Sequence, residues 1–295
     1  MACIVCLIAA PETSRLDPFL VDRVRRSLPE TELEWLAPTE ACELGPLEIE
    51  PDLARRTART VLDDAPIDVI ATDAEDRRKK ILLCDMDSTI IGVECVDELA
   101  GVLNVRDQVA AITRRAMNGE LPFREALVSR VSLLAGLPLS TLEEIAAQVP
   151  LNAGAKTLVR TMTKNGATAA LVSGGFTHFT DPVARQVGFA QHLSNELEIV
   201  DQRLTGRLIP PVLGKDAKVE KMDDLCRERE VSRDAVVAVG DGANDLPMLQ
   251  AAGLGLAYRA HQTVRAAIAN RIDSGALTAA LYAQGYRWDE FVTGD

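Results

Sequence analysis

Two aspartates that follow an apolar run are the first residues in this chain whose types and spacing suggest chemistry. Residues 81–91 read Ile-Leu-Leu-Cys-Asp-Met-Asp-Ser-Thr-Ile-Ile, so Asp85 and Asp87 come directly after a predicted buried strand. Ligands of open α/β sheets bind outside the carboxyl ends of the strands, where these carboxylates would lie. The pair suits a Mg²⁺-assisted reaction in which one carboxylate attacks and the other transfers protons. A solvated turn is the alternative reading of this fragment.

A hydroxyl and two glycines follow a second predicted strand, at Ser173-Gly174-Gly175. Glycine lets the backbone approach a phosphate closely, so its N–H groups and the Ser173 hydroxyl could cradle phosphoryl oxygens. Taken alone, Ser-Gly-Gly is better explained as an ordinary turn.

Three oxygen-bearing side chains follow a third predicted strand, in Gly240-Asp241-Gly242-Ala243-Asn244-Asp245. Such oxygens suit a hard cation such as Mg²⁺, whereas a plain Asp-Gly turn needs no metal. We favour the metal reading. Asp245 could instead cap the helix that begins near Pro247, or hold Lys218 in place.

Two lysines lie between these clusters, Lys215 and Lys218. An ammonium near the nucleophile would screen the repulsion between an anionic carboxylate and an anionic ester. Most lysines are solvated, and the residues alone do not separate Lys215 from Lys218.

The predicted elements explain how these clusters would meet. From residue 81 onward, apolar strands alternate with helical stretches, the pattern of a parallel sheet with helices on both faces. Because each cluster follows a strand of one parallel sheet, the clusters should converge on the same edge. The predicted strands are Lys80–Asp85, Thr168–Ser173, Ala235–Gly240 and Gly255–Ala257.

Helical patterns alone fill residues 93–150, directly after the first of these strands. An insertion there would lie above Asp85, so we interpret it as a cap whose movement could exclude water from the site. Ser140 and Glu143 have the spacing of a capping box, which predicts a helix starting near Thr141.

Residues 1–76 read as a separate unit without a histidine, an acid cluster or a glycine-rich loop. The order of its predicted elements, βαββαβ, fits a ferredoxin-like domain. The charged stretch 73–80 reads as a solvated linker, which leaves 77–295 as the second domain. The expected elements are strands Cys3–Ala9, Glu32–Leu36, Ala41–Leu47 and Ile67–Ala71, and helices Leu16–Leu28 and Leu53–Leu62.

Composition narrows the class of protein. The 295 residues suggest about two domains, and the net charge of −12 argues against nucleic acid as a partner. No run approaches the roughly 20 apolar residues of a membrane span, and no targeting pattern is visible at the N-terminus. Cys3 and Cys6 read as core packing rather than a redox or metal pair. These features favour a cytoplasmic protein.

In chain order, the acid pair, Ser-Gly-Gly, the lysine and Gly-Asp-Gly-Ala-Asn-Asp resemble the four motifs of the haloacid dehalogenase-like (HAD) phosphatase superfamily. The first motif, Asp-Met-Asp-Ser-Thr, is similar to that of the phosphoserine phosphatases. This resemblance covers about residues 80–285 and includes 93–100, Met117-Asn118-Gly119, Phe123, 129–134, 172–176 and 240–248. Residues 1–76 at most look like the small amino-acid-binding (ACT-like) regulatory domains of some members.

The resemblance implies an α/β fold: a Rossmann-like parallel sheet with a helical cap, plus the N-terminal α+β ferredoxin-like domain. It implies Mg²⁺-dependent hydrolysis of O-phospho-L-serine, the last step of serine biosynthesis. Asp85 would become an aspartyl-phosphate, Asp87 would be general acid and base, and Lys218 would match the family lysine better than Lys215. The implied Mg²⁺ ligands are the carboxylates of Asp85 and Asp241 and the main-chain carbonyl of Asp87.

The implied substrate contacts lie partly in the cap. Glu94 would pair with the amino group and Arg130 with the carboxylate, for which a planar guanidinium is suited. By composition alone, Arg130 would be a solvated arginine and Glu94 a favourable charge at a helix start. The complete implied set is Glu94, Met117, Phe123, Arg130, Ser173, Gly174 and Asn244.

Two rival functions stay open. An enzyme of the same fold could act on another small phosphomonoester or transfer phosphate to another acceptor, although Glu94 and Arg130 are both present. An amino-acid-sensing module with a vestigial catalytic half is disfavoured because the acid pair, Lys218 and Asp241 are intact. The expected partner is a small-molecule substrate, and a homodimer is compatible with a sequence that does not fix the oligomeric state.

Overall fold

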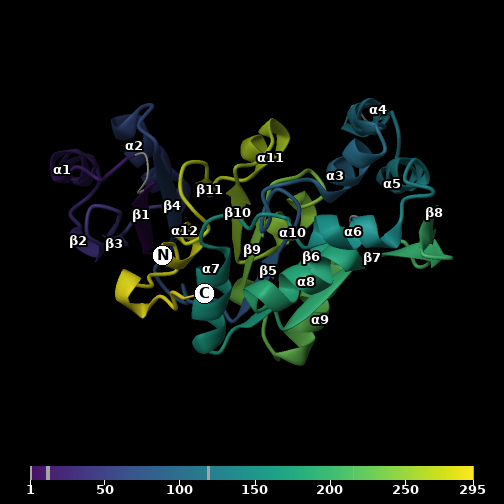
Figure 1. Cartoon of the computed structure of the whole chain (residues 1–295). Helices are drawn as coiled ribbons and strands as arrows, with labels where there is room; N and C mark the ends of the chain where they lie inside the picture. Colours follow the sequence, from purple (N-terminus) through teal and green to yellow (C-terminus); the bar gives the residue numbers. More distant parts are fainter. Residues whose placement is uncertain (1, 11–13, 118–119, 215, 295) are drawn as a thin grey trace.

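The apolar runs assemble into one seven-stranded sheet in the computed structural model, which describes residues 2–10, 14–117, 120–214 and 216–294 (Figure 1). The strand order is β11-β10-β9-β5-β6-β7-β8, and all neighbours are parallel except the final antiparallel pair. The strands are β5 Ile81–Cys84, β6 Thr168–Phe176, β7 Gln191–Val200, β8 Arg203–Ile209, β9 Val236–Gly240, β10 Leu254–Tyr258 and β11 Arg271–Ile272.

The α/β fold predicted from the sequence is confirmed, and each of the four strands predicted for this sheet is present. The strands β7, β8 and β11 were not predicted. Much of β7 and β8 is exposed or half-buried and polar, so these strands lack an apolar run. The two-residue β11 is too short to give a pattern.

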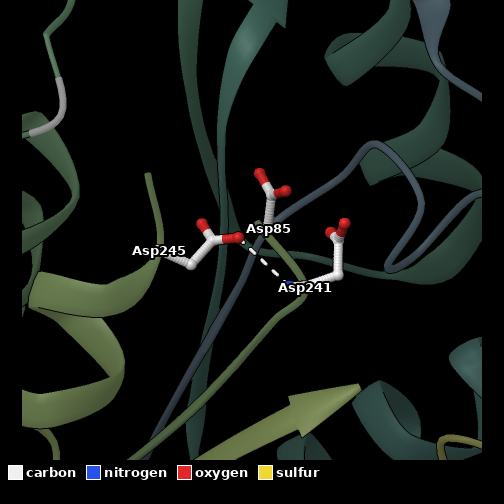
Figure 2. A group of neighbouring side chains, drawn as sticks. All are labelled: Asp85, Asp241 and Asp245. Atoms are coloured by element: carbon white, nitrogen blue, oxygen red, sulfur yellow. Dashed lines mark hydrogen bonds between the residues drawn. The ribbon is translucent and has the colours of Figure 1, made fainter. Parts of the chain in front are cut away.

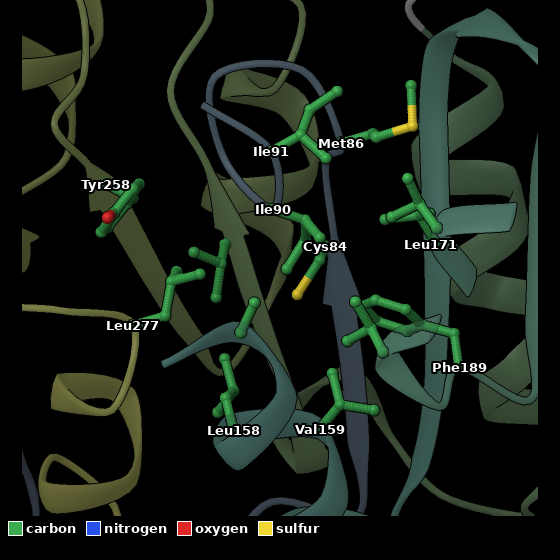
Figure 3. Close-up of a cluster of buried hydrophobic side chains, with 14 of the residues drawn as sticks. Cys84, Met86, Ile90, Ile91, Leu158, Val159, Leu171, Phe189, Tyr258 and Leu277 are labelled. Atoms are coloured by element: carbon green, nitrogen blue, oxygen red, sulfur yellow. The ribbon is translucent and has the colours of Figure 1, made fainter. Parts of the chain in front are cut away.

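Alternate residues of β5 point to opposite faces of the sheet, and helices cover both. Leu82 and Cys84 pack into the core on the side of α7 and α8, and Figure 3 shows part of this cluster around Cys84 and Leu158. Ile81 and Leu83 pack with side chains of α9 and α10 on the other side. The helices of this region are α7 Ala155–Lys164, α8 Thr177–Val187, α9 Ala217–Glu228, α10 Leu246–Ala251, α11 Gln262–Ala267 and α12 Ala279–Tyr282. Two 3₁₀ helices span Arg233–Ala235 and Trp288–Glu290.

The described residues of the insertion between β5 and α7 form four helices, as the sequence predicts for the cap. They are α3 Cys95–Val102, α4 Arg106–Met117, α5 Phe123–Ser132 and α6 Leu139–Ala146. The predicted capping box is wrong, because α6 begins at Leu139 after Pro138 and has no side-chain cap hydrogen bond. Ser140 therefore lies inside the first turn.

The two chain segments that connect the sheet to the cap are hydrogen-bonded to each other. The Gly92 N–H donates to the Pro150 carbonyl, and the Asn152 N–H donates to the Ile90 carbonyl. The Asn152 side-chain amide also reaches the carbonyls of Ser88, Thr89 and Ile91, at 3.4, 2.8 and 3.1 Å. Both ends of the cap are therefore hydrogen-bonded to the loop that follows Asp85.

The N-terminal residues form an antiparallel sheet in the order β2-β3-β1-β4, which confirms the ferredoxin-like arrangement. Its strands are β1 Cys3–Ala9, β2 Glu32–Ala37, β3 Ala41–Leu47 and β4 Ile67–Asp73, and its helices are α1 Pro18–Ser27 and α2 Pro51–Leu62. One face, including Cys3 and Val5, packs with the two helices. None of the helices in the described ranges has the length and apolarity that crossing a membrane requires.

The other face of this sheet shares a core with the large domain. Cys6 and Ile8 of β1 belong to the same buried cluster as Tyr282 and Tyr286 near the C-terminus. Figure 1 shows α12 next to the N-terminal sheet. The buried carboxylate of Asp68 on β4 also accepts three hydrogen bonds, at 2.7 to 3.0 Å, from the backbone N–H groups of residues 273–275. The interface is therefore both apolar and specifically hydrogen-bonded.

Candidate active site

The carboxylate of Asp85 lies just beyond the end of β5, the central strand of the large sheet. It is buried, and its Oδ1 accepts a hydrogen bond of 2.5 Å from the ammonium of Lys218 at the start of α9. The same ammonium donates to Oδ1 of Asp245, also at 2.5 Å. Burial and the Asp245 carboxylate raise the pKa of Asp85, against the opposite effect of Lys218. Burial lowers the pKa of Lys218, but the two carboxylates raise it more.

Asp245 organises the loop that carries the third carboxylate, Asp241. Its Oδ2 accepts hydrogen bonds from the backbone N–H groups of Asp241 and Gly242, at 3.1 and 2.9 Å, and Figure 2 shows the first of these. A β-carbon at Gly240 would come within 2.6 Å of Asp245 Cγ, so this approach requires glycine. Of the two roles left open for Asp245, the contact with Lys218 is confirmed, whereas its side chain caps no helix.

The three carboxylates form a group that fits a divalent cation. Asp85, Asp241 and Asp245 offer oxygens that all lie within 4.8 Å of one another. Lys218 contacts Asp85 and Asp245, whereas the one side-chain donor that reaches Asp241 among the described residues is the Thr89 hydroxyl, at 2.8 Å. Burial, followed by repulsion from Asp245, raises the pKa of Asp241 to about 6. In the described part of the chain, one ammonium thus faces three buried acids, and a cation beside Asp241 would relieve the excess negative charge.

Asp87 contacts β6 and the start of α3. Its Oδ2 accepts a 3.0 Å hydrogen bond from the Ser173 hydroxyl, and its Oδ1 accepts one of 2.9 Å from the Cys95 N–H. The Ser173 Oγ in turn accepts the Gly175 N–H at 2.8 Å. The structure therefore joins the acid pair to Ser-Gly-Gly, as expected from the convergence of strand ends. The main-chain carbonyl of Asp87 as a metal ligand stays a prediction.

Phe123 of the cap lies against the Ser-Gly-Gly loop. A β-carbon at Gly174 would stand 3.3 Å from Phe123 Cζ, so the first residue of α5 closes over this loop. Asn244 is half-buried in the neighbouring loop, and its contact with substrate stays a prediction. Met117 ends α4, but its side chain, together with Asn118, Gly119 and Lys215, lies outside the described residues.

Glu94 stands between the acid loop and the cap, immediately before α3. Its Oε1 accepts a 2.7 Å hydrogen bond from the Ser88 hydroxyl. Desolvation, and then the nearby Asp87 carboxylate, raises the pKa of Glu94 to about 7. More than a third of the residue is nevertheless accessible to solvent, which screens such repulsion. Glu94 is thus an accessible acid beside the predicted leaving-group side of the site.

Arg130 on α5 carries an unpaired polar atom. Its Nε is buried and has no hydrogen-bond partner in the described part of the chain. Burial lowers the pKa of this guanidinium, while Glu94, Asp97 and Asp87 raise it, in that order. Arg130 therefore lies within the electrostatic field of the predicted site, with donor capacity left for a ligand.

Several positioning contacts were not predicted. Thr89 lies two residues after Asp87, yet nothing in its type indicated that it would contact Asp241. Asn152 lies 67 positions after Asp85 and Asn195 lies still further on, outside every motif. Only the fold brings their amides to the active-site loops.

The comparisons with known proteins agree with this geometry. Residues 82–250, more than half of the chain, match the haloacid dehalogenase-like hydrolase family. A phosphoserine phosphatase from Archaeoglobus fulgidus is 41% identical over 218 residues, which cover 74% of this chain and 62% of that protein. One from Mycobacterium tuberculosis is 40% identical over 219 residues, which cover 74% of this chain and 54% of that protein. The chain thus spans less than two thirds of the length of either relative.

Solved structures share the fold. A HAD family hydrolase from Salmonella enterica serovar Typhi has a TM-score of 0.84 at 28% identity, covering 96% of this chain and 98% of its own. A probable phosphoserine phosphatase from Vibrio cholerae has a TM-score of 0.77 at 30% identity, with 98% and 88% covered. A phospho-aspartyl intermediate analogue of phosphoserine phosphatase has a TM-score of 0.65 at 33% identity, with 69% and 98% covered.

The residues of the predicted motifs lie within the range that matches the family, and the structure brings them together. The acid pair at β5, Ser173 at β6, Lys218 at α9 and Asp241 after β9 meet at one edge of the sheet. The chain belongs to the haloacid dehalogenase-like hydrolase family.

Proposed function

We propose that this chain hydrolyses O-phospho-L-serine to L-serine and phosphate through an aspartyl-phosphate on Asp85. The proposal rests on the different environments of two carboxylates in one loop. Asp85 is buried and bound to Lys218, whereas Asp87, two residues later, accepts a hydroxyl donor on the other side. The similarity to phosphoserine phosphatases, one of them solved as a phospho-aspartyl analogue, supports this reading.

The reaction divides into two displacements at phosphorus. A carboxylate oxygen of Asp85 bonds to phosphorus while the bond to the seryl oxygen breaks, and Asp87 gives that oxygen a proton. Asp87 then takes a proton from water, whose oxygen attacks phosphorus and releases Asp85 with inorganic phosphate. Ser173, Gly174, Asn244 and Lys218 bind the phosphoryl oxygens and oppose their charge.

The proposed cofactor is Mg²⁺, held by Asp85, Asp241 and the Asp87 carbonyl. Asp245 is a poor candidate ligand because both its oxygens are already engaged, one by Lys218 and one by two N–H groups. The ion would supply positive charge where an anionic ester meets an anionic nucleophile.

The cap is the proposed binding site for the serine part of the substrate. Arg130 would bind the substrate carboxylate with donors that include its unpaired Nε, and Glu94 would accept the ammonium. Phe123, against Gly174, and Met117 would cover the substrate.

The organisation around this site is also proposed. Residues 1–76 would form a regulatory-type domain and 77–295 the phosphatase domain, with the cap at about 93–150. The six free, buried thiols favour a cytoplasmic location. A homodimer is the assembly that we would test first, by light scattering.

Phosphate release from O-phospho-L-serine, beside a panel of other phosphomonoesters, tests this function. We expect hydrolysis that EDTA abolishes, Mg²⁺ restores and Ca²⁺ restores poorly, because the larger Ca²⁺ disturbs in-line geometry. Asp85→Asn should keep the fold and lose activity. Turnover by Asp85→Asn, or full activity after chelation, would contradict the mechanism. Preference for another ester would leave a HAD phosphatase of different substrate, and no hydrolysis at all would favour a sensing module.

A further inference from the structure

Asn195 on β7 has a buried amide that contacts two loops of the site. Its Nδ2 donates to the Gly174 carbonyl at 2.9 Å, and its Oδ1 accepts the Leu213 N–H at 2.8 Å. The residue is only 1% exposed. Both ends of the amide are thus used, and water has little access to them.

The first contact, with Gly174, lies where the pairing between β6 and β7 is interrupted. Strands β6 and β7 pair in register up to Val172 and Leu193, and again at Phe176 and Asn195. Between these pairs, the three residues 173–175 of β6 stand opposite a single residue of β7, so the phosphate-binding loop is a bulge. The bulge frees the loop from the ladder, and the Asn195 amide provides a donor for the carbonyl of Gly174.

The second contact reaches toward the catalytic lysine. Leu213 lies in the segment between β8 and α9, five positions before Lys218. The carbonyl oxygen of the Asn195 amide holds the backbone of this segment, while its nitrogen holds the backbone of Gly174. One side chain therefore ties the loop at the end of β6 to the approach to α9.

We propose that Asn195 is a positioning residue that fixes the phosphoryl-binding loop and joins it to the segment at Leu213. It acts through its hydrogen bonds to Gly174 and Leu213 rather than by contact with the reacting atoms. The proposal rests on the function proposed above and concerns the phosphoryl half of the site. Loss of the Asn195 amide should therefore lower the rate of hydrolysis of every phosphomonoester alike, whatever group the cap binds.

Asn195→Asp is the sharpest test because it keeps the shape and the acceptor for Leu213 but places an acceptor opposite the Gly174 carbonyl. We expect kcat to fall by about tenfold or more on both O-phospho-L-serine and p-nitrophenyl phosphate. Inhibition by inorganic phosphate, measured with Mg²⁺ present, should weaken by a similar factor. A purely structural role would lower the melting temperature without moving these two quantities.

Asn270→Asp is the matched control. Asn270 also uses both ends of its amide on backbone, donating to the Ala71 carbonyl and accepting its N–H at 2.9 and 3.0 Å, but it lies at the interface with the N-terminal sheet. We expect this variant to lose stability and to keep its kcat and its inhibition by phosphate. Equal kinetic losses in the two variants, or unchanged kinetics in Asn195→Asp, would overturn the proposal.

Two further arms keep the outcomes separate. If Asn195→Asp does not fold, the neutral pair Asn195→Ser and Asn270→Ser replaces it under the same criteria. If the wild type hydrolyses neither ester, the proposed function fails by itself. Calorimetric binding of inorganic phosphate then decides on Asn195, with weaker binding in the Asn195 variant alone as the supporting result and equal binding as the contrary one.

Discussion

Replacement of Arg130 by methionine tests whether the cap reads the serine part of the substrate. The change keeps the length of the side chain and removes the guanidinium, whose buried Nε has no partner among the described residues. A charge-assisted hydrogen bond lost from such a site costs about 1.5–3 kcal/mol. We therefore expect kcat/KM for O-phospho-L-serine to fall roughly ten- to a hundredfold.

The comparison substrate decides what the loss means. p-Nitrophenyl phosphate has no carboxylate, so its kcat/KM should change much less in Arg130→Met. Arg124→Met is the control, because Arg124 lies on the same helix but is exposed, and both substrates should be hydrolysed nearly as by the wild type. Equal losses on the two substrates in Arg130→Met would refute the reasoning and return Arg130 to a structural role in α5.

Three further predictions address the acids. Asp87→Asn should lower kcat for phosphoserine by about 10²–10⁴-fold. The kcat for p-nitrophenyl phosphate should fall less, because nitrophenolate leaves without needing a proton. An equal loss on both substrates would assign Asp87 another role. Asp245→Asn should lower both kcat and the melting temperature, because breaking a buried ion pair costs about 3–5 kcal/mol; an unchanged melting curve would contradict the ion pair with Lys218. Since the pKa of Glu94 is raised to about 7, its carboxylate is ionised above that pH, and kcat/KM for phosphoserine relative to p-nitrophenyl phosphate should fall as pH drops through 7. Glu94→Gln should flatten this ratio, and a pH-independent ratio in the wild type would count against the role of Glu94.

The parts of the fold that the sequence predicts are those with a strong apolar pattern. β1 and β3 have the predicted bounds, Cys3–Ala9 and Ala41–Leu47, because both strands are largely buried. The strands β7 and β8 have no such pattern, since they form a hairpin at the edge of the sheet. β7 and β8 pair with each other across residues 201–202, and the pairing of β7 with β6 joins this hairpin to the sheet.

The residues of the site also differ in how well the sequence predicts them. Motif residues such as Asp85 and Ser173 could be predicted because their types suggest chemistry and their positions follow strands. Asn195 could not, because a buried asparagine in a half-polar strand looks like any other surface-strand residue until the bulge in β6 is known. The role of Asp245 was left open for a related reason, since a carboxylate that holds a lysine and one that caps a helix have the same local sequence.

The core shared by the N-terminal sheet and the large domain has a consequence for how this chain can vary in evolution. Because Cys6 and Ile8 pack in one cluster with Tyr282 and Tyr286, the first 76 residues are not a detachable accessory. Deleting these residues would expose this apolar wall of the large domain to water. Exchanging them for the equivalent unit of a relative would place other side chains against it. Substitutions on one side of this wall should therefore alter the stability contributed by the other side, because the two sides pack against each other.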